Sequence, residues 1–414
     1  MSWMDESDYA RIQFATLDQI EKSVLVYWPK TKGHSKKQTK IYGNDWTFVD
    51  GGAAKRELYL HNIKTNKLKA GTTYQYQVGS ESSGKTVWSK EYEFHTATHS
   101  EEFSFIATGD IGACNAVAVS HMMDLAKTHK YDFVTVGGDQ AYNMDDFDGT
   151  KGDEYLNFMQ DLFAQVPYLG AVGNHEANYN FSHYKNRFNV VPFAESKFDN
   201  SMMYSINYKS LHLVSFSTEV YFEGSDNEIL TAINWLEQDL TEANKHRAER
   251  PWIIFLTHHP IYCSVDSTDC TSKAATIKSG PTNLNNETWG GIEDILLKHN
   301  VDIYLSGHVH NYERTYPVAH GNRTASNYHN APSLFQLVIG NAGQPEGPST
   351  FGNGPFPDWS AVRYGSYGFS TVTVSPTKMQ FVHHQANIDG TVGKVMDRFE
   401  VTKDKAHSKR DCVA

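Results

Sequence analysis

The 414-residue sequence lacks an excess of positive charge, a long apolar segment and more than four cysteines. Its formal net charge is −11 at pH 7, and lysine and arginine do not cluster with aromatic residues, so we expect neither a nucleic-acid partner nor a membrane surface as partner. No segment approaches the roughly 18 consecutive apolar residues of a transmembrane helix. The sequence also does not open on a basic segment followed by an apolar run, so no signal peptide is visible.

The four cysteines limit how the chain can be cross-linked. Cys263 and Cys270 are seven positions apart and could close a small loop as a disulfide or be two free thiols; we predict the disulfide. Cys114 and Cys412 could be free or could pair across the fold.

Three sequons for N-glycosylation lie in polar, loop-like segments. A sequon alone is weak evidence, because several occur by chance in a chain of this length. The predicted acceptors are Asn180, Asn286 and Asn322.

The composition, with 39% hydrophobic and 13% aromatic residues, is that of a globular protein with a large core, and the length allows two or more domains. Residues 1–97 predict an all-β sandwich, because short runs rich in Val, Tyr and Leu alternate with Gly, Asn and Lys. This part carries no cluster of ligand-type residues, so we interpret it as a structural or docking module. Its clearest strands are expected at 22–28, 56–60, 72–78 and 92–96.

From residue 103 the pattern changes to strands separated by helices, which predicts crossover connections and a largely parallel sheet. We expect a catalytic domain over 98–403 and a polar tail over 404–414. The strands are predicted at 103–107, 132–136, 168–172, 252–256 and 301–305, and the helices at 117–130, 154–165, 230–245 and 291–299. After the apolar run 336–340 the chain is expected to return to antiparallel strands, at 369–374, 379–383 and 395–401.

Metal-ligand residue types follow five of these predicted strands. Any one of them could be a helix cap or a turn residue, but five in succession are not easily explained that way. In an open α/β sheet, ligands bind at the carboxyl ends of the strands, so these side chains are expected to converge. The candidates are Asp110, Asp139, Tyr142, Asn174, His175, His258, His259, His308 and His310.

The residue types predict the kind of metal. Aspartate, asparagine and histidine give mixed oxygen and nitrogen ligation that suits Fe, Zn or Mn, and a carboxylate can bridge two ions. Tyr142, three residues after Asp139, is the discriminating ligand, since a phenol ionises readily only beside a strongly charged centre such as Fe(III). The sequence therefore predicts one trivalent and one divalent ion.

These segments, in this order and with the tyrosine, resemble the purple acid phosphatases of the calcineurin-like metallophosphoesterase superfamily. Residues 311–314, 359–363 and 367–369 are similar to flanking segments of the high-molecular-weight members, whose β-rich front domain is fibronectin type III-like. The resemblance implies an α/β fold, a four-layer αββα metallophosphoesterase sandwich, preceded by an all-β fibronectin type III-like sandwich domain.

The resemblance also implies a role for each candidate. Asp139 would bridge the ions, and His175 would hydrogen-bond the phosphate or protonate the leaving oxygen. His258 is preferred to His259 because the family's ligand stands two residues before the proline. The implied ligands are Asp110, Tyr142 and His310 for Fe(III), and Asn174, His258 and His308 for a divalent ion, which is Zn, Fe or Mn.

The sequence departs from the family pattern at two places. Plant members carry a further histidine pair, whereas residues 265–280 have none and Cys263 and Cys270 occupy that region, as in animal-type members. The segment Ser2-Trp3-Met4 resembles the interior of an early strand of the front domain. We therefore expect that a signal peptide and the first strand are missing from this sequence, and that the protein is secreted or lysosomal.

The predicted function is an acid phosphatase that hydrolyses small phosphate monoesters with a metal-activated hydroxide, as a monomer or homodimer. One alternative is a metallophosphoesterase acting on phosphodiesters or nucleotides, against which Tyr142 argues. Another is a non-catalytic binding protein with a vestigial metal site, which the intact ligand set disfavours.

Overall fold

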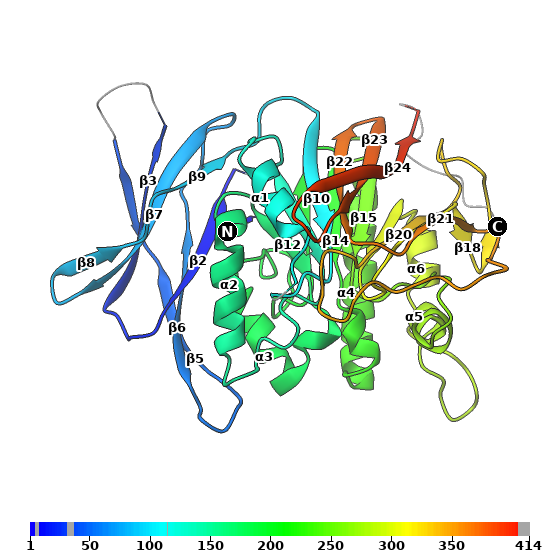
Figure 1. Cartoon of the computed structure of the whole chain (residues 1–414), viewed down its shortest axis with the longest axis horizontal. Helices are drawn as coiled ribbons and strands as arrows, with labels where there is room; N and C mark the ends of the chain where they lie inside the picture. The colour runs from blue at the N-terminus through cyan, green and yellow to red at the C-terminus, as the bar shows by residue number, and fades with distance from the viewer. Residues whose placement is uncertain (5–7, 31–36, 114, 405–414) are drawn as a thin grey trace.

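The computed structural model describes residues 1–4, 8–30, 37–113 and 115–404 (Figure 1). Cys114, Cys412 and almost all of the predicted tail lie outside these ranges. The first part of the chain is all-β, as predicted. Its strands are β1 (Ser2–Trp3), β2 (Ala10–Thr16), β3 (Lys22–Pro29), β4 (Thr39–Tyr42), β5 (Asn44–Val49), β6 (Glu57–Lys64), β7 (Thr73–Ser82), β8 (Lys85–Trp88) and β9 (Tyr92–His95).

These strands form two antiparallel sheets. One has the order β1-β2-β6-β5, and the other has the order β4-β3-β7-β8 with β9 also paired to β7. The alternation in β7 buries Tyr74, Tyr76 and Val78 on one face, which is the period expected of a half-buried strand. The sequence pattern did not reveal β4 and β5, because both are largely exposed and carry no strong apolar alternation.

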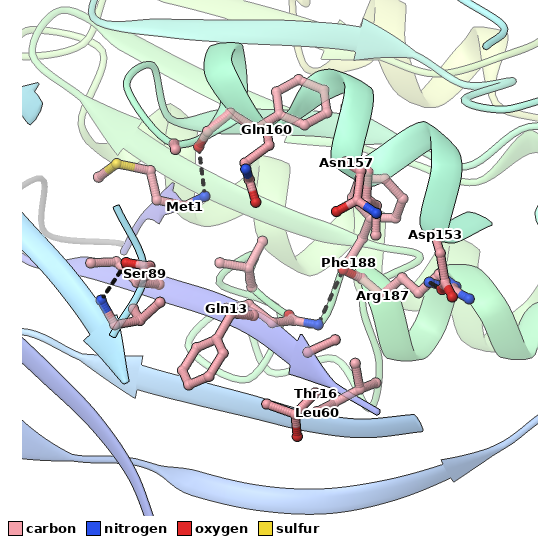
Figure 2. A pocket seen from close by; sticks show the side chains of 18 of the residues that line it. Met1, Gln13, Thr16, Leu60, Ser89, Asp153, Asn157, Gln160, Arg187 and Phe188 are labelled. Atoms are coloured by element: carbon pink, nitrogen blue, oxygen red, sulfur yellow. Dashed lines mark hydrogen bonds and ion pairs between the residues drawn. The ribbon is translucent and has the colours of Figure 1, made fainter. Parts of the chain in front are cut away.

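The β-sandwich is fixed to the rest of the chain by direct contacts along a pocket of about 370 Å³ (Figure 2). Tyr76 Oη donates to the Ala164 carbonyl at 2.7 Å, and Trp3 Nε1 donates to the Asp132 carbonyl at 2.8 Å. Gln13 Nε2 donates to the Asn186 carbonyl at 2.7 Å. The front part therefore contacts the α/β part through two buried aromatic side chains and one partly buried amide side chain.

The larger part alternates strands and helices up to residue 306 and then becomes mostly β. Helix α2 begins earlier than predicted, α1 is shorter, and a β-hairpin that the pattern did not reveal precedes α4. Its elements are β10 (Phe103–Thr108), α1 (Val119–Ala126), β11 (Phe133–Gly137), α2 (Thr150–Phe163), β12 (Tyr168–Ala171), α3 (Asn178–Arg187), β13 (Tyr204–Tyr208), β14 (Leu211–Ser215), α4 (Asp226–Lys245), β15 (Trp252–Leu256), α5 (Ala274–Ser279), α6 (Glu293–Lys298), β16 (Ile303–Ser306), β17 (Tyr312–Thr315), β18 (Val318–Ala319), β19 (Asn322–Arg323), β20 (Phe335–Ile339), β21 (Ser360–Tyr364), β22 (Gly368–Ser375), β23 (Lys378–Ala386) and β24 (Val392–Thr402), with short helices η1 (Asn174–Glu176), η2 (Thr218–Tyr221) and η3 (Asp269–Lys273).

The strands form two sheets, as the four-layer expectation requires, and both are mixed rather than largely parallel. One has the order β12-β11-β10-β22-β23-β24 and the other β13-β14-β15-β16-β20-β17-β21. Within them, β10, β11 and β12 pair in parallel, as do β14, β15, β16 and β20. The strand pattern alone could not assign each strand to its sheet, because a strand buried on both faces has the same apolar run whichever sheet it joins.

Strand β15 shows how the layers stack. Trp252, Ile254 and Leu256 belong to the large core shared by the two sheets, whereas Ile253 and Phe255 face a second core. That second core is completed by α4, through Leu236 and Leu240 among others, and by residues of α5 and α6. Helices α1 and α2 contribute to the large core from the side of the other sheet, so the sheets lie between helices, as the four-layer expectation states.

The stacking brings carboxyl ends of strands from both sheets to one place. Strands β10, β11 and β12 arrive from one sheet, and β15 and β16 from the other. The backbone N–H of His308, just after β16, donates to the Asp110 carboxylate, just after β10, at 3.0 Å. Across the described ranges, no helix is long and apolar enough to cross a membrane.

Candidate metal centre

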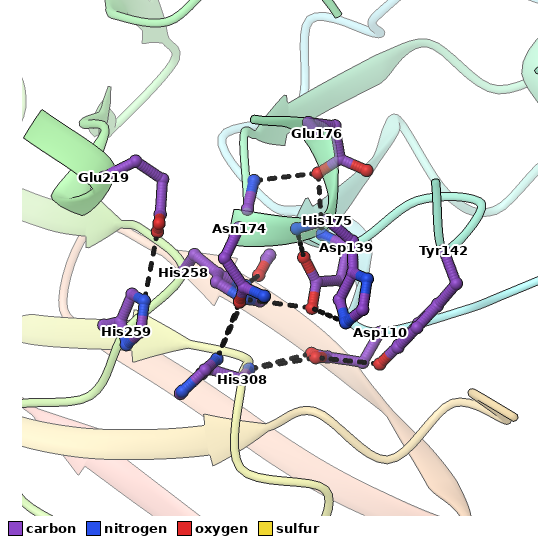
Figure 3. A network of polar contacts seen from close by, with 12 residues as sticks. Asp110, Asp139, Tyr142, Asn174, His175, Glu176, Glu219, His258, His259 and His308 are labelled. Carbon is purple, nitrogen blue, oxygen red and sulfur yellow. Dashed lines mark hydrogen bonds and ion pairs between the residues drawn. The ribbon is translucent and has the colours of Figure 1, made fainter. Parts of the chain in front are cut away.

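The turns that follow the strands have an unusual backbone conformation. Asp110, Asp139, Tyr142 and His308 all have positive φ, at 56°, 49°, 57° and 66°. Residues other than glycine adopt this left-handed region at a cost, and such residues cluster at functional sites. Here the conformation turns four candidate side chains toward a common centre (Figure 3).

The first group of side chains contains the tyrosine. Tyr142 Oη lies 2.8 Å from His310 Nε2 and 3.4 Å from Asp110 Oδ1, and His310 Nε2 lies 3.5 Å from that same Asp110 oxygen. Burial raises the pKa of Tyr142, and the neighbouring carboxylates of Asp110 and Asp139 raise it further. The phenol therefore stays protonated unless a strong cation enters this group.

The second group contains Asn174, His258 and His308. Asn174 Oδ1 lies 2.9 Å from His258 Nε2 and 3.0 Å from His308 Nδ1, and the two nitrogens are 3.2 Å apart. The other nitrogen of His258, Nδ1, lies 2.7 Å from the Gly137 carbonyl, which can only accept a hydrogen bond. That contact places a hydrogen on Nδ1, so Nε2 is the nitrogen that faces the centre.

Asp139 lies between the two groups. Its Oδ2 is 3.2 Å from His258 Nε2, and ligand atoms of Asp110, Asp139 and His258 all lie within 4.8 Å of one another. Burial opposes ionisation of Asp139, but His258 and the other histidines lower its pKa on balance. Burial likewise lowers the pKa of His258, and Asp139 raises it well above the usual value. A carboxylate so placed can contact cations in both groups.

Glu176 supports this arrangement although sequence reasoning did not select it. Its buried carboxylate accepts backbone N–H groups of Asp139 at 3.1 Å, Gln140 at 2.9 Å and Gly173 at 2.8 Å. Burial and Asp139 raise the pKa of Glu176 to about 8. It ties the loop after β11 to the loop after β12. Its position beside His175 in a ligand-rich segment was the only available signal.

His175 lies at the edge of the centre, with 24% of its side chain exposed. Its Nδ1 is 2.9 Å from Asn143 Oδ1, and its ring is 4.4 Å from the Tyr142 ring. Its Nε2 is 4.0 Å from Asp139 Oδ2 and 3.7 Å from Glu346 Oε1. The imidazole thus has one nitrogen held by the amide and one directed toward the carboxylates.

His259 does not join Asn174 and Asp139 as His258 does. Its Nε2 lies 3.3 Å from Glu219 Oε1 in a buried pair, and its ring packs 4.8 Å from Phe222. Burial raises the pKa of Glu219 to about 7. The ring centroid of His259 also lies 3.7 Å from that of His308, with the rings tilted by 43°, and ligand atoms of His258, His259 and His308 lie within 4.8 Å of one another. The choice of His258 over His259 therefore stays a prediction.

The residues predicted to form a disulfide or to carry glycans are not members of the two ligand groups. The disulfide between Cys263 and Cys270 is present, with 5.0 Å between the Cα atoms. The three sequon asparagines, Asn180, Asn286 and Asn322, are exposed, so a glycan could reach each of them. Their glycosylation stays a prediction.

The donor chemistry fits two metal ions. Each group offers three oxygen or nitrogen atoms within about hydrogen-bond distance of one another, and the residue between them is a buried carboxylate. Two imidazole nitrogens 3.2 Å apart, His258 Nε2 and His308 Nδ1, offer donor atoms for a shared cation. Two packed mixed sheets with such ligands at their strand ends form a candidate two-metal centre of the kind that hydrolytic enzymes use.

Comparisons with known proteins narrow this class. Residues 103–312 match the calcineurin-like phosphoesterase family, residues 1–96 the purple acid phosphatase N-terminal domain, and residues 333–398 the iron/zinc purple acid phosphatase-like protein C family. Acid phosphatase type 7 of Homo sapiens is 36% identical over 84% of this chain and 78% of its own length. The chain belongs to the purple acid phosphatase family.

More distant members match over a similar extent. The Fe(3+)-Zn(2+) purple acid phosphatase 12 of Arabidopsis thaliana is 27% identical over 92% of this chain and 78% of its own length. A purple acid phosphatase from yellow lupin (Lupinus luteus) seeds has a similar fold, with a TM-score of 0.76 at 20% identity, covering 97% of this chain and 73% of that one.

Proposed function

We propose that this protein is an acid phosphatase that hydrolyses phosphate monoesters at a centre of Fe(III) and one divalent ion, Zn, Fe or Mn. The observation that carries the proposal is the division of the ligand side chains into two groups with Asp139 between them. The names of the relatives, acid phosphatase type 7 and Fe(3+)-Zn(2+) purple acid phosphatase, support the same activity and metals.

The proposed ligands follow the two groups. Asp139 would bind both ions, and each of the two groups of side chains would hold one of them. Two ions, when bound, supply charge neutralisation for a phosphate group and lower the pKa of a water molecule, so that hydroxide is available at acid pH. We assign Asp110, Tyr142 and His310 to Fe(III), and Asn174, His258 and His308 to the divalent ion.

The chain's own residues would orient the substrate and move protons. His175 Nε2 points toward the centre while Asn143 Oδ1 accepts the hydrogen of Nδ1. Glu176 would keep the loop of Asp139 in place through three backbone hydrogen bonds. We further propose that the domain division falls near residue 97 and that the protein is secreted or lysosomal and glycosylated.

Purified protein that contains iron and a divalent ion is expected to be coloured and to hydrolyse an aryl phosphate at about pH 5, because Tyr142 ionised on Fe(III) absorbs visible light. Tyr142→Phe is expected to lose the band, since the phenolate is gone. Visible spectra, metal analysis and an aryl phosphate assay measure this. A colourless wild-type protein that holds only Zn or Mn and prefers a phosphodiester would favour the diesterase alternative, and absence of any turnover would favour a binding protein.

His175→Ala is expected to lower kcat about 10²-fold for phenyl phosphate, whose leaving group needs a proton. The loss should be smaller for p-nitrophenyl phosphate, because nitrophenolate departs without one. Asn143→Ala should follow the same pattern more weakly, since Asn143 only orients the ring. Equal losses for both substrates would assign His175 to phosphate binding instead, and unchanged kinetics would contradict any catalytic role.

A further inference from the structure

The histidines proposed as ligands differ in what holds their second nitrogen. For His258, the Gly137 carbonyl takes the Nδ1 hydrogen at 2.7 Å. For His308, Nδ1 faces Asn174 and His258, and the opposite nitrogen, Nε2, lies 3.0 Å from Asp269 Oδ1. The imidazole of His308 thus meets a carboxylate on the side away from the centre, where His258 meets a carbonyl.

We propose that Asp269 is the positioning residue of the divalent-ion site: its carboxylate accepts the Nε2 hydrogen of His308 and leaves the Nδ1 lone pair for the ion. This inference rests on the proposed function. A partner on the outer nitrogen fixes the tautomer and the ring orientation of a metal-binding histidine and makes it a better donor. In the structure His308 Nε2 is buried and has no aligned hydrogen-bond partner among the described residues, so Asp269, at 3.0 Å, is the group placed to satisfy it.

Covalent and ionic contacts hold Asp269 in this position. It begins the short helix η3, where Lys273 Nζ lies 2.8 Å from Asp269 Oδ1. Its chain neighbour Cys270 is bonded to Cys263, and that cysteine packs in a small apolar cluster with Val309, the residue next to His308. The disulfide therefore joins the segment that carries the carboxylate to the segment that carries the histidine.

Asp269 also belongs to the segment that, in plant members of the family, carries a further histidine pair. Residues 265–280 contain no histidine, yet Asp269 reaches the His308 ring from this segment. The His308 ring also packs against His259, with 3.7 Å between the ring centroids and a tilt of 43°. The His308 imidazole thus contacts both an aromatic ring and a carboxylate, which restricts its orientation.

The test titrates Zn²⁺ into the full-length protein loaded with Fe(III), in wild type, Asp269→Ala and Asp269→Asn. The matched control is Asp266→Ala, an exposed aspartate in the same disulfide loop. Asp269→Ala is expected to weaken Zn²⁺ binding about 10-fold to 100-fold, and Asp269→Asn less, because the amide oxygen can still accept the hydrogen. Iron content and the visible band should stay unchanged in both, and Asp266→Ala should match wild type.

Two results would overturn the inference. One is Zn²⁺ affinity of Asp269→Ala equal to that of wild type. The other is equal weakening of iron and zinc binding, which would mean a general loss of structure. If the alanine variant does not fold, the same comparison on Asp269→Asn decides. A wild-type protein that binds no Zn²⁺ or has no phosphatase activity would contradict the proposed function, whereas an unaffected Asp269→Ala beside an active wild type contradicts only the role of Asp269.

Variants that lack the disulfide provide a second test of the same proposal. Replacing Cys263 and Cys270 together by Ser is expected to weaken Zn²⁺ binding in the wild-type background. In the Asp269→Ala background the same replacement should have no further effect on Zn²⁺ affinity, because residues that act through one contact are not additive. Additive losses would show that the disulfide does not act through Asp269.

Discussion

Asp139→Asn is expected to lower phosphatase turnover by on the order of 10³-fold and to remove at least one of the two ions. The loss in turnover corresponds to about 4 kcal/mol of lost transition-state stabilisation. Asparagine has one acceptor oxygen and no charge, so it cannot bridge two cations. In the protein, Asp139 lies 3.2 Å from His258 and within 4.8 Å of a ligand atom of Asp110, so the substitution affects both groups. Metal analysis and steady-state kinetics on the purified variant measure the loss.

The control for this substitution is Asp146→Asn, in the loop that follows the same strand. Asp146 forms an ion pair with Lys151 at 3.1 Å and is not among the proposed ligands. It carries the same change of charge and should retain full metal content. An Asp139→Asn protein with two ions and wild-type turnover would refute the bridging role and, with it, the binuclear assignment.

The proposed ligands could be chosen from the sequence because each follows a strand that is recognisable by its apolar run. Strand β15 was predicted with its observed ends, and His258 follows two residues later. Buried β-branched and aromatic residues specify a strand locally, and chain continuity then places the next polar residue at its carboxyl end. For the same reason Asp110 and His308 could be chosen without knowing which strands pair.

Which strand joins which of the two sheets could not be predicted from the strand pattern, because strand pairing is decided by long-range packing. The hairpin of β13 and β14 was also missed, although β14 lies beside β15 and shares its core. Contacts between side chains far apart in the sequence could not be predicted either. Asp269 contacts His308 although 39 positions separate them, and the sequence of the disulfide loop did not indicate that one of its carboxylates lies beside this proposed ligand. The local pattern gives element types, while the network around the site requires the tertiary structure.

His308→Ala and His310→Ala are expected to lose different ions, although the two histidines are separated by a single residue. His310 Nε2 lies 2.8 Å from the phenol of Tyr142, and His308 Nδ1 lies 3.0 Å from Asn174. His310→Ala should therefore lose Fe(III) and the visible band. His308→Ala should keep the band and lose the divalent ion. Each variant should lose at least about 10²-fold in turnover, because one ion of the pair is gone.

Metal stoichiometry and the visible spectrum, measured on the same samples, separate these outcomes, with the exposed His320→Ala as the control for removing a nearby histidine. Val309, between the two histidines, packs into an apolar cluster with Cys263 and Val338, while the rings on either side of it face different partners. A single ion held by both rings would make the two variants lose the same metal and the same band. That result would refute the two-ion arrangement, because no assignment of Asp139 as a bridge survives a centre with one ion.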